Sequence, residues 1–458
     1  MRTLPLIAAA LTALCLPTLP AQNCSKTSTG LVPLVGLGTN KYKGFTGGLY
    51  PGASNTMPAA HAAAGLAEAK LLQPLDAQGK PSSTGKIVLL SIGMSNTTQE
   101  WTAFEDLSRL VTSRNPDLVI VDGAIGGQDA RIVADRSNDY WTKLHQRLQA
   151  AGVTPEQVQA FWLKEAVARP DTAWPAHAIE LKDLLGTIVR LLRADFPNGR
   201  LCFLSSRIYA GYATTTLNPE PFAYESGFSV KWLIEQQIGG ATELNWDPTK
   251  GKVVAPWLAW GPYLWSDGTK GGNGNLVWLC DDFSSDGTHP SYNGRFKVAQ
   301  ELDLFFGSSP FTQPWYFGPS TPAPAAWMLY GDTCRGSLGE PRTYVKGKPV
   351  IGNTTGFIVG ADNIPQSTVA VSMIGLNNGF FQLAPRCDIV VDPFQIVFFH
   401  PIVVTQGKVE IIIPILNDKT AIGSRLFTQW LVLDPQGTWT ALLGRLSLSR
   451  GVLVQAGL

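Results

Sequence analysis

Between residues 86 and 307, short apolar runs alternate with longer segments of helical periodicity. The short runs are apolar throughout, as expected for strands covered on both faces. The predicted strands are residues 87–92, 118–121, 158–163, 201–204 and 276–279. The predicted helices, with apolar residues three and four positions apart, are residues 100–112, 139–151, 176–195, 222–238 and 292–306. This alternation predicts βαβ units and a parallel five-stranded sheet in an α/β domain.

The rest of the chain divides into further regions, since 458 residues suffice for more than one core. Residues 308–326 are rich in Ser, Thr, Pro and aromatic residues, which favours a semi-rigid linker. Beyond them, β-branched runs alternate with Gly, Asn, Asp and Pro turns, at residues 369–374, 395–404, 409–415 and 446–454. We therefore predict an α/β domain over residues 22–307, which residues 22–85 wrap, and an all-β sandwich over 327–458.

The N-terminus has the features of a signal peptide. A positive charge at Arg2 precedes an apolar run that ends in small residues at Ala21. A membrane anchor is the alternative, but the run is shorter than the roughly 20 residues that a spanning helix needs. We expect cleavage after Ala21 and secretion, either extracellular or periplasmic, and we expect no membrane span in the remainder.

Charge and ligand spacing restrict the partners. The chain holds 36 Lys and Arg against 35 Asp and Glu, so it lacks the basic footprint of a nucleic-acid-binding protein. No pair of Cys or His residues has the spacing of metal ligands. We expect no metal, no organic cofactor and no nucleic acid as partner.

Five cysteines follow residue 21, an odd number in a compartment that permits disulfides. Cys334 and Cys387 both lie in the C-terminal region and are the pair that we expect to be bonded. Cys202 and Cys280 lie in apolar runs, which favours a role as small buried hydrophobic residues.

The first predicted strand ends in the sequence SIGMSN, residues 91–96. Ser95 therefore lies at the carboxyl end of a strand, where open α/β sheets bind their ligands, just before a helix expected near residue 99. This position suits a nucleophile. Alternatively, Ser95 or Thr98 is an N-cap of that helix. The motif also lacks the second glycine of the Gly-x-Ser-x-Gly elbow, since Thr97 stands there.

A second motif, SSDGTHP at residues 284–290, follows the last predicted strand. Asp286 lies three residues before His289, near enough to orient the imidazole of a general base. The alternative makes Asp286 a turn residue and His289 a helix-start residue. The other four histidines lie in or beside predicted helices or in the β domain, where packing or surface roles are simpler.

A third motif, DGAIGGQ at residues 122–128, follows the second strand. Its glycines allow the backbone to approach a ligand, and the N–H of Gly127 is a candidate oxyanion donor. A phosphate-binding loop is the competing interpretation, but neither of its glycine patterns is present. A plain tight turn also remains open.

Together these motifs, Gly93-x-Ser95-Asn96, Gly127 and Asp286-x-x-His289, resemble the GDSL/SGNH hydrolase superfamily in sequence and order. The resemblance covers roughly residues 86–306. It implies a flavodoxin-like three-layer sandwich and a serine hydrolase that acts on ester bonds.

The resemblance also implies site residues. The triad would be Ser95, Asp286 and His289, with Ser95 and Gly127 donating to the oxyanion. The family's block-three Asn has no counterpart, because the third strand runs into FWLKEA at residues 161–166. Lys164 could take its place, somewhat as Gln does in sialate O-acetylesterase-like relatives; equally, Lys164 and Glu165 could form a structural pair.

The expected substrate is an acyl ester, with acetylated or otherwise acylated carbohydrate preferred, which includes polysaccharide. Asn96, Trp162 and Gln128 are the predicted substrate-binding residues, and aromatic residues crowd the segments before His289. A non-catalytic carbohydrate-binding or surface protein on a hydrolase scaffold is the alternative, and the missing Asn is its main support. The β domain shows no chemistry, so glycan binding, surface attachment and stabilisation all remain open.

Overall fold

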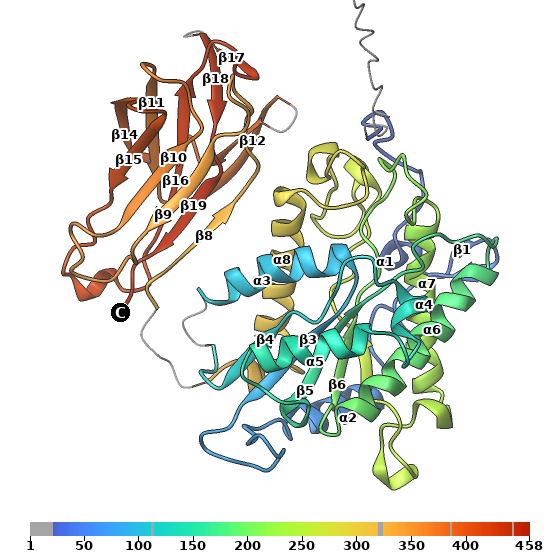
Figure 1. Cartoon of the computed structure of the whole chain (residues 1–458). Helices are drawn as coiled ribbons and strands as arrows, with labels where there is room; N and C mark the ends of the chain where they lie inside the picture. Colours follow the sequence, from blue (N-terminus) through green and yellow to red (C-terminus); the bar gives the residue numbers. More distant parts are fainter. Residues whose placement is uncertain (1–21, 111–113, 319–323, 385–386, 442–443) are drawn as a thin grey trace, which may run out of the picture.

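The computed structural model describes residues 22–110, 114–318, 324–384, 387–441 and 444–458 (Figure 1). It has a parallel α/β part and a separate antiparallel all-β part, as predicted. The predicted signal peptide, Thr112 and residues 319–323 of the predicted linker lie outside the described residues. In the part of the chain that is described, no helix combines the length and apolar character needed to cross a membrane.

A five-stranded parallel sheet forms the centre of the α/β part. Its strands are β3 (Ile87–Gly93), β4 (Leu118–Val121), β5 (Val158–Lys164), β6 (Leu201–Leu204) and β7 (Trp257–Trp260), in the order β4-β3-β5-β6-β7. Every neighbouring pair runs parallel. Since parallel strands share one carboxyl edge, the segments after β3, β4, β5 and β6 come together there.

The first four predicted strands are confirmed, but the fifth prediction was wrong. Residues 276–279 form no strand, and Leu276 makes only an isolated bridge to Asn273. The fifth strand is instead β7, which is buried along its whole length beside β6. β7 and residues 276–279 are each a run of four apolar residues, and such a run is too short for periodicity to distinguish a strand from a buried loop.

Helices cover both faces of the sheet. Successive side chains of β5 point to opposite faces: Phe161 packs against Phe196 at the end of α6, whereas Trp162 stacks on Trp101 of α3. The helices are α1 (Leu34–Leu37), α2 (Ala59–Ala69), α3 (Ser95–Ser108), α4 (Ala130–Val133), α5 (Tyr140–Ala150), α6 (Ala176–Asp195), α7 (Phe222–Ile238), α8 (Tyr292–Ser308) and α9 (Gln313–Tyr316). The helix expected from residue 100 begins earlier, at Ser95 itself. Residues 308–326, predicted as a linker, include α9, whose Trp315 and Tyr316 are buried.

The segment before β3 packs onto this domain, as expected. Leu34, Leu37 and Leu72 belong to the main hydrophobic core, and a short hairpin joins β1 (Lys41–Tyr42) to β2 (Phe45–Thr46). A disulfide joins Cys24 to Cys280. The expectation that Cys280 is merely a small buried residue was therefore wrong; Cys202, in contrast, is a free and buried thiol.

The all-β part consists of antiparallel strands in two main sheets and a hairpin. The larger sheet has the order β14-β11-β16-β18-β17, with β19 pairing to β16 and β8 to β19; the smaller has the order β15-β10-β9; and β12 pairs with β13. The strands are β8 (Ala326–Tyr330), β9 (Arg342–Lys346), β10 (Ile358–Asp362), β11 (Val369–Gly375), β12 (Asn378–Ala384), β13 (Cys387–Val391), β14 (Ile396–Val403), β15 (Lys408–Ile412), β16 (Arg425–Leu433), β17 (Trp439–Ala441), β18 (Gly444–Leu448) and β19 (Gly451–Gln455).

A shared core joins the two main sheets, because Val359 of β10 lies in one apolar cluster with Ile374 of β11 and Val454 of β19. The expected Cys334–Cys387 disulfide is confirmed. The run at residues 446–454 was predicted as one strand. β18 and β19 follow one another along β16, both antiparallel to it, so the predicted strand is present with an interruption at residues 449–450.

The β part rests against α8. The ring of Phe296 packs on Tyr330 of β8 at 5.7 Å between centroids, and the Arg450 guanidinium lies 3.5 Å from the centre of the Tyr292 ring. Asn293 also donates a hydrogen bond to the Asp388 carboxylate. The two parts therefore meet beside α3 and α8 (Figure 1).

Candidate active site

Ser95 occupies the tight connection between β3 and α3. β3 ends at Gly93, where an added Cβ would lie 2.5 Å from the carbonyl oxygen of Lys164, so only glycine allows β3 and β5 to approach here. Ser95 is the first residue of α3. Its N–H therefore has no acceptor within the helix and points from the positive end of the helix dipole.

Ser95, His289 and Asp286 form one hydrogen-bonded chain. The Ser95 Oγ lies 2.8 Å from Nε2 of His289, and Nδ1 of His289 lies 2.5 Å from Oδ2 of Asp286. The N-cap position of α3 is held by Met94. Ser95 is the first residue of the helix and Thr98 lies inside it, so neither of them is the N-cap. The structure brings together these three residues from positions 95 and 286–289.

Asp286 is held by its own turn as well as by the imidazole. Its Oδ1 accepts hydrogen bonds from the backbone N–H groups of Thr288 at 2.9 Å and His289 at 3.0 Å. Partial burial opposes ionisation, but these bonds and the His289 imidazole outweigh it and lower the pKa of Asp286 to about 2. Asp286 thus carries a fixed negative charge against Nδ1.

Packing fixes the turn that carries His289. Gly287 has a φ of +66°, and a Cβ there would overlap the backbone carbonyl of Tyr212. The Ser284 N–H donates to the His289 carbonyl at 2.7 Å, and the Ser291 hydroxyl caps α8. His289 is therefore neither the cap nor the first residue of that helix.

Asn96 braces the same turn. Its Nδ2 donates to the carbonyl of Thr288 at 3.0 Å, and the residue is only 2% exposed. The predicted substrate contact by Asn96 is not supported, because the amide is engaged inside the protein. Asn96 instead ties the first turn of α3 to the His289 turn.

The glycine-rich loop after β4 lies beside Ser95. The Ile125 N–H donates to the Gly93 carbonyl at 2.9 Å, and a Cβ on Gly126 would lie 3.7 Å from the Ser95 Cβ. Gly127 is exposed, has a φ of +77° and has open space where a side chain would project. The loop thus leaves room for a ligand over Gly127. The next residue, Gln128, is half-buried, and its Oε1 has no hydrogen-bond partner among the described residues.

A carboxylate that sequence reasoning did not single out supports this loop. Asp122 accepts hydrogen bonds from Ser91 at 2.8 Å, from the Thr98 hydroxyl, and from Arg147 at 3.1 Å. Arg147 also donates to the Ala124 carbonyl at 2.7 Å. Asp122 therefore couples β3, α3 and the loop, and its place directly after a predicted strand was the available signal.

Lys164 was predicted to face the site, but its side chain is engaged elsewhere. Its ammonium lies 2.5 Å and 2.6 Å from the two carboxylate oxygens of Glu100, and both residues are buried. Burial lowers the pKa of Lys164 to about 8, a shift that the charge of Glu100 opposes. The predicted oxyanion role is not supported, because the ammonium is bound to Glu100, which also replaces Glu165 as its structural partner.

Trp162 is likewise engaged in the core. It is fully buried, stacks on Trp101 at 5.3 Å, and its Nε1 donates to Ser205. These contacts do not support its predicted role in substrate binding. Further buried polar groups lie beyond the ends of β5 and β6: burial raises the pKa of Glu165 and lowers that of Arg207.

The other histidines have packing partners in the α/β part. His61 bonds the Leu258 carbonyl, His145 pairs with Asp195, and His177 pairs with Glu225. Across the residues that the structure describes, no three His, Cys, Asp or Glu side chains gather as a metal site.

Comparison with known proteins finds distant structural neighbours, while no protein-family model and no curated protein matches the chain. A Streptococcus pneumonia protein whose description refers to platelet activating factor is 15% identical, covering 53% of this chain and 92% of its own, with a TM-score of 0.27. The periplasmic domain of a lipopolysaccharide acetyltransferase from Salmonella ser. Paratyphi A is 14% identical over 49% of this chain and 84% of its own, with a TM-score of 0.27. A carbohydrate acetylesterase from Xanthomonas citri is 11% identical over 80% and 78%, again with a TM-score of 0.27. At such scores the function must be argued from the site itself.

Proposed function

We propose that the protein is a serine esterase in which Ser95 is the nucleophile, His289 the general base and Asp286 its orienting carboxylate. One observation carries the proposal: the unbroken hydrogen-bonded chain from Ser95 Oγ through His289 to Asp286. It lies at the carboxyl edge of a parallel sheet, where open α/β folds bind substrates. A serine, a base and an orienting group within hydrogen-bond reach are what nucleophilic catalysis requires.

In the proposed first step, Ser95 Oγ attacks the ester carbonyl while Nε2 of His289 takes the hydroxyl proton. The ionised Asp286 stabilises the imidazolium and keeps Nδ1 protonated. The N–H of Ser95, at the start of α3, and that of Gly127 would donate to the oxyanion. His289 then returns the proton to the departing alcohol, leaving an acyl ester on Ser95.

In the second step, water repeats the reaction on the acyl-enzyme. His289 takes a proton from the water as the hydroxide oxygen adds to the acyl carbon, and it returns the proton to Ser95 Oγ as the acid leaves. The cycle consumes one water and one ester and yields one acid and one alcohol.

The natural substrate proposed here is an acyl ester, preferably an acetyl ester on carbohydrate, and we propose that the protein acts after export. Two disulfides, Cys24–Cys280 and Cys334–Cys387, fit an oxidising compartment. The alternative is a non-catalytic glycan-binding protein on a hydrolase scaffold, which would hydrolyse no ester.

Hydrolysis of p-nitrophenyl acetate by residues 22–458 tests the proposal. We expect turnover by the wild type and a loss of at least about a thousandfold in kcat/KM for both Ser95→Ala and His289→Ala. Circular dichroism should show that both variants stay folded. Equal inactivity of all three proteins towards this ester and towards acetylated glycans would contradict the proposal and favour the binding protein.

A further inference from the structure

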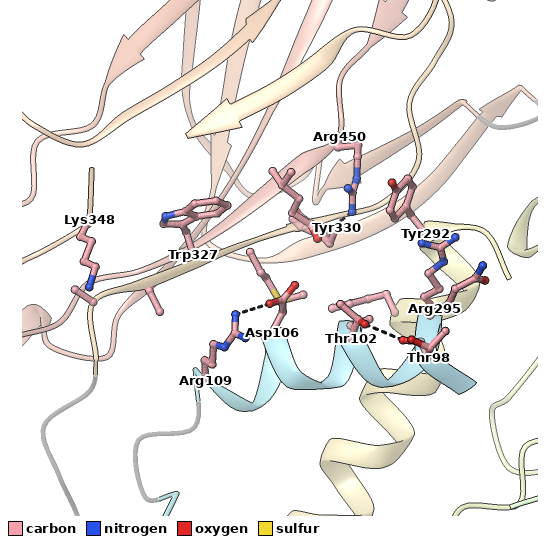
Figure 2. Close-up of a pocket in the computed structure, with 17 residues that line it drawn as sticks. Thr98, Thr102, Asp106, Arg109, Tyr292, Arg295, Trp327, Tyr330, Lys348 and Arg450 are labelled. Carbon is pink, nitrogen blue, oxygen red and sulfur yellow. Dashed lines mark hydrogen bonds and ion pairs between the residues drawn. The ribbon is translucent and has the colours of Figure 1, made fainter. Parts of the chain in front are cut away.

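A cavity of about 690 Å³ lies where the α/β part meets the β part, between α3, α8 and β8. Figure 2 shows side chains of α3 pointing into it from one side and those of the β part from the other. None of the steps proposed for ester hydrolysis uses it. The β part supplies Trp327, Tyr330, Lys348 and Arg450 to its wall.

The cavity begins three residues beyond the candidate nucleophile, at Thr98 of α3. Its wall on this helix includes Thr98, Thr102, Asp106 and Arg109. Positions 3, 7, 11 and 14 residues after Ser95 lie on one face of a helix, so these residues continue the stripe that Ser95 begins. From Thr98 to Arg109 the stripe extends about 16 Å, at about 1.5 Å per residue. This is far longer than an acetyl group.

The second wall begins beside the general base. Tyr292 and Arg295 follow His289 by three and six residues on α8, and both line the cavity. The Nε of Arg295 donates to the Pro290 carbonyl at 3.1 Å, which places its guanidinium next to the His289 turn. The cavity therefore begins three residues beyond Ser95, at Thr98, and three residues beyond His289, at Tyr292.

Positive charge predominates in the lining. It contains four cations, Arg109, Arg295, Lys348 and Arg450, against one carboxylate, Asp106, which is paired with Arg109 at 2.8 Å. Lys348 is exposed and makes no ion pair with any residue in the described ranges. Arg450 donates to the backbone carbonyls of Leu329 and Gly331 and is fixed over the Tyr292 ring. The positive electrostatic potential of this lining favours an anionic ligand over a neutral one.

Aromatic and polar groups accompany the charges. Trp327 is 39% exposed, and Figure 2 places its ring on the wall formed by β8. On the opposite wall, Gln99 lines the cavity, and its Oε1 is buried with no hydrogen-bond partner among the described residues. An exposed ring suits stacking on a sugar face, and an unmet acceptor suits a hydroxyl.

We propose that this cavity binds the chain of an acidic polysaccharide, with its carboxylates against the cationic lining and an esterified unit at Ser95. The inference rests on the proposed function and adds a substrate class to it. It also gives the β part a role: it completes the binding cleft. Arg guanidinium groups bind carboxylates through paired N–H groups, and aromatic rings supply the sugar-stacking surface.

Binding can be measured apart from catalysis by using the Ser95→Ala variant of residues 22–458. Isothermal titration with oligogalacturonates and with uncharged xylo-oligosaccharides of equal length should show binding of the acidic chain at least tenfold tighter. Adding Lys348→Glu should weaken oligogalacturonate binding roughly tenfold, because an exposed cation becomes an anion. The matched control is Lys80→Glu, an exposed lysine in the turn before β3, at the opposite end of the sheet.

Equal binding of both oligosaccharides, or no binding of either, would overturn the inference. So would equal effects of Lys348→Glu and Lys80→Glu. Trp327→Ala should weaken both chains if the ring stacks on sugars, and no change would remove that contact from the proposal. Failure of the proposed function is a separate result, because it requires wild-type protein that hydrolyses neither p-nitrophenyl acetate nor acetylated glycans, whatever the titrations show.

Discussion

The charge on Asp286 depends on a few hydrogen bonds within a single turn. The backbone N–H groups of Thr288 and His289 and the imidazole Nδ1 all stabilise the ionised carboxylate. A carboxylate held in this way resists protonation, because protonation would remove its acceptor capacity towards these donors. The orienting group should therefore stay ionised at acidic pH.

This yields a prediction for stability against pH. The pKa of Asp286 is about 2 in the folded protein, against 3.8 ordinarily. The ionised carboxylate therefore stabilises the fold fully above about pH 4, and this contribution is lost as the pH falls towards about 2. The difference in free energy of unfolding between wild type and Asp286→Asn, measured with urea from pH 7 to pH 2.5, should shrink in that window. A difference that is constant with pH would contradict the assignment.

The buried pair Lys164–Glu100 gives a second prediction. Lys164→Met leaves the Glu100 charge buried without a partner and should cost about 3–5 kcal/mol of stability. The double variant Lys164→Met, Glu100→Leu removes both charges and should recover most of that loss, with kcat within about tenfold of wild type. A well-folded Lys164→Met protein that loses more than a hundredfold in kcat would restore the oxyanion role.

At the scale of elements, the connection from β3 to α3 positions Ser95. An alanine Cβ at Gly93 would meet the Lys164 carbonyl at 2.5 Å. Gly93→Ala should therefore push β3 away from β5, cost about 1–3 kcal/mol, and reduce kcat. Gly186→Ala in α6 is the control, since its nearest neighbour is a flexible leucine methyl at 3.4 Å and alanine favours helices. Thermal unfolding and ester hydrolysis of both variants test this, and equal effects would contradict it.

The long helices α6 and α7 have a clear helical period, and they match their predicted bounds. The short apolar runs of β4 and β6 were also predicted with their observed bounds, although they are too short to show a period. β7 was missed because its four apolar residues look like those at 276–279, and only the neighbouring β6 distinguishes them. The early start of α3, at Ser95, was not predicted, because residues 95–99 are polar and lack the apolar period of the rest of the helix.

The candidate site was predictable where one turn carries its chemistry, as in the Asp286–His289 spacing. The contacts of Lys164, Trp162 and Asn96 were not predictable, because the position of a residue in the sequence does not reveal which way its side chain faces. Their partners Glu100, Ser205 and Thr288 lie 64, 43 and 192 residues away. Such pairings appear only once the chain is folded.

Across the whole molecule, the N-terminal segment reaches the candidate site. The Gln22 N–H donates to the Ser285 carbonyl at 2.7 Å, and the Asn23 N–H donates to the Tyr212 carbonyl at 2.9 Å. The Cys24–Cys280 disulfide fixes this segment close to the turn that carries Asp286 and His289. The disulfide thus restrains the site as well as the fold.

The double variant Cys24→Ala, Cys280→Ala should lose about 2–5 kcal/mol of stability, because the disulfide that it removes closes a very long loop. Its esterase activity should also decline at lower temperature than that of wild type. Cys334→Ala, Cys387→Ala is the comparison, since that bond lies within the β part, and its loss should leave hydrolysis of a small ester unaffected. Equal heat sensitivity of activity in both variants would contradict a link between the N-terminal segment and the site.

The central claim is that Ser95 is an activated nucleophile, and a fluorophosphonate probe tests it most directly. Intact-protein and peptide mass spectrometry of the labelled wild type should find one adduct, on the peptide that contains Ser95. Both Ser95→Ala and His289→Ala should remain unlabelled under the same conditions, because one lacks the oxygen and the other the base. No adduct on the wild type, or an adduct that persists in Ser95→Ala, would contradict the account.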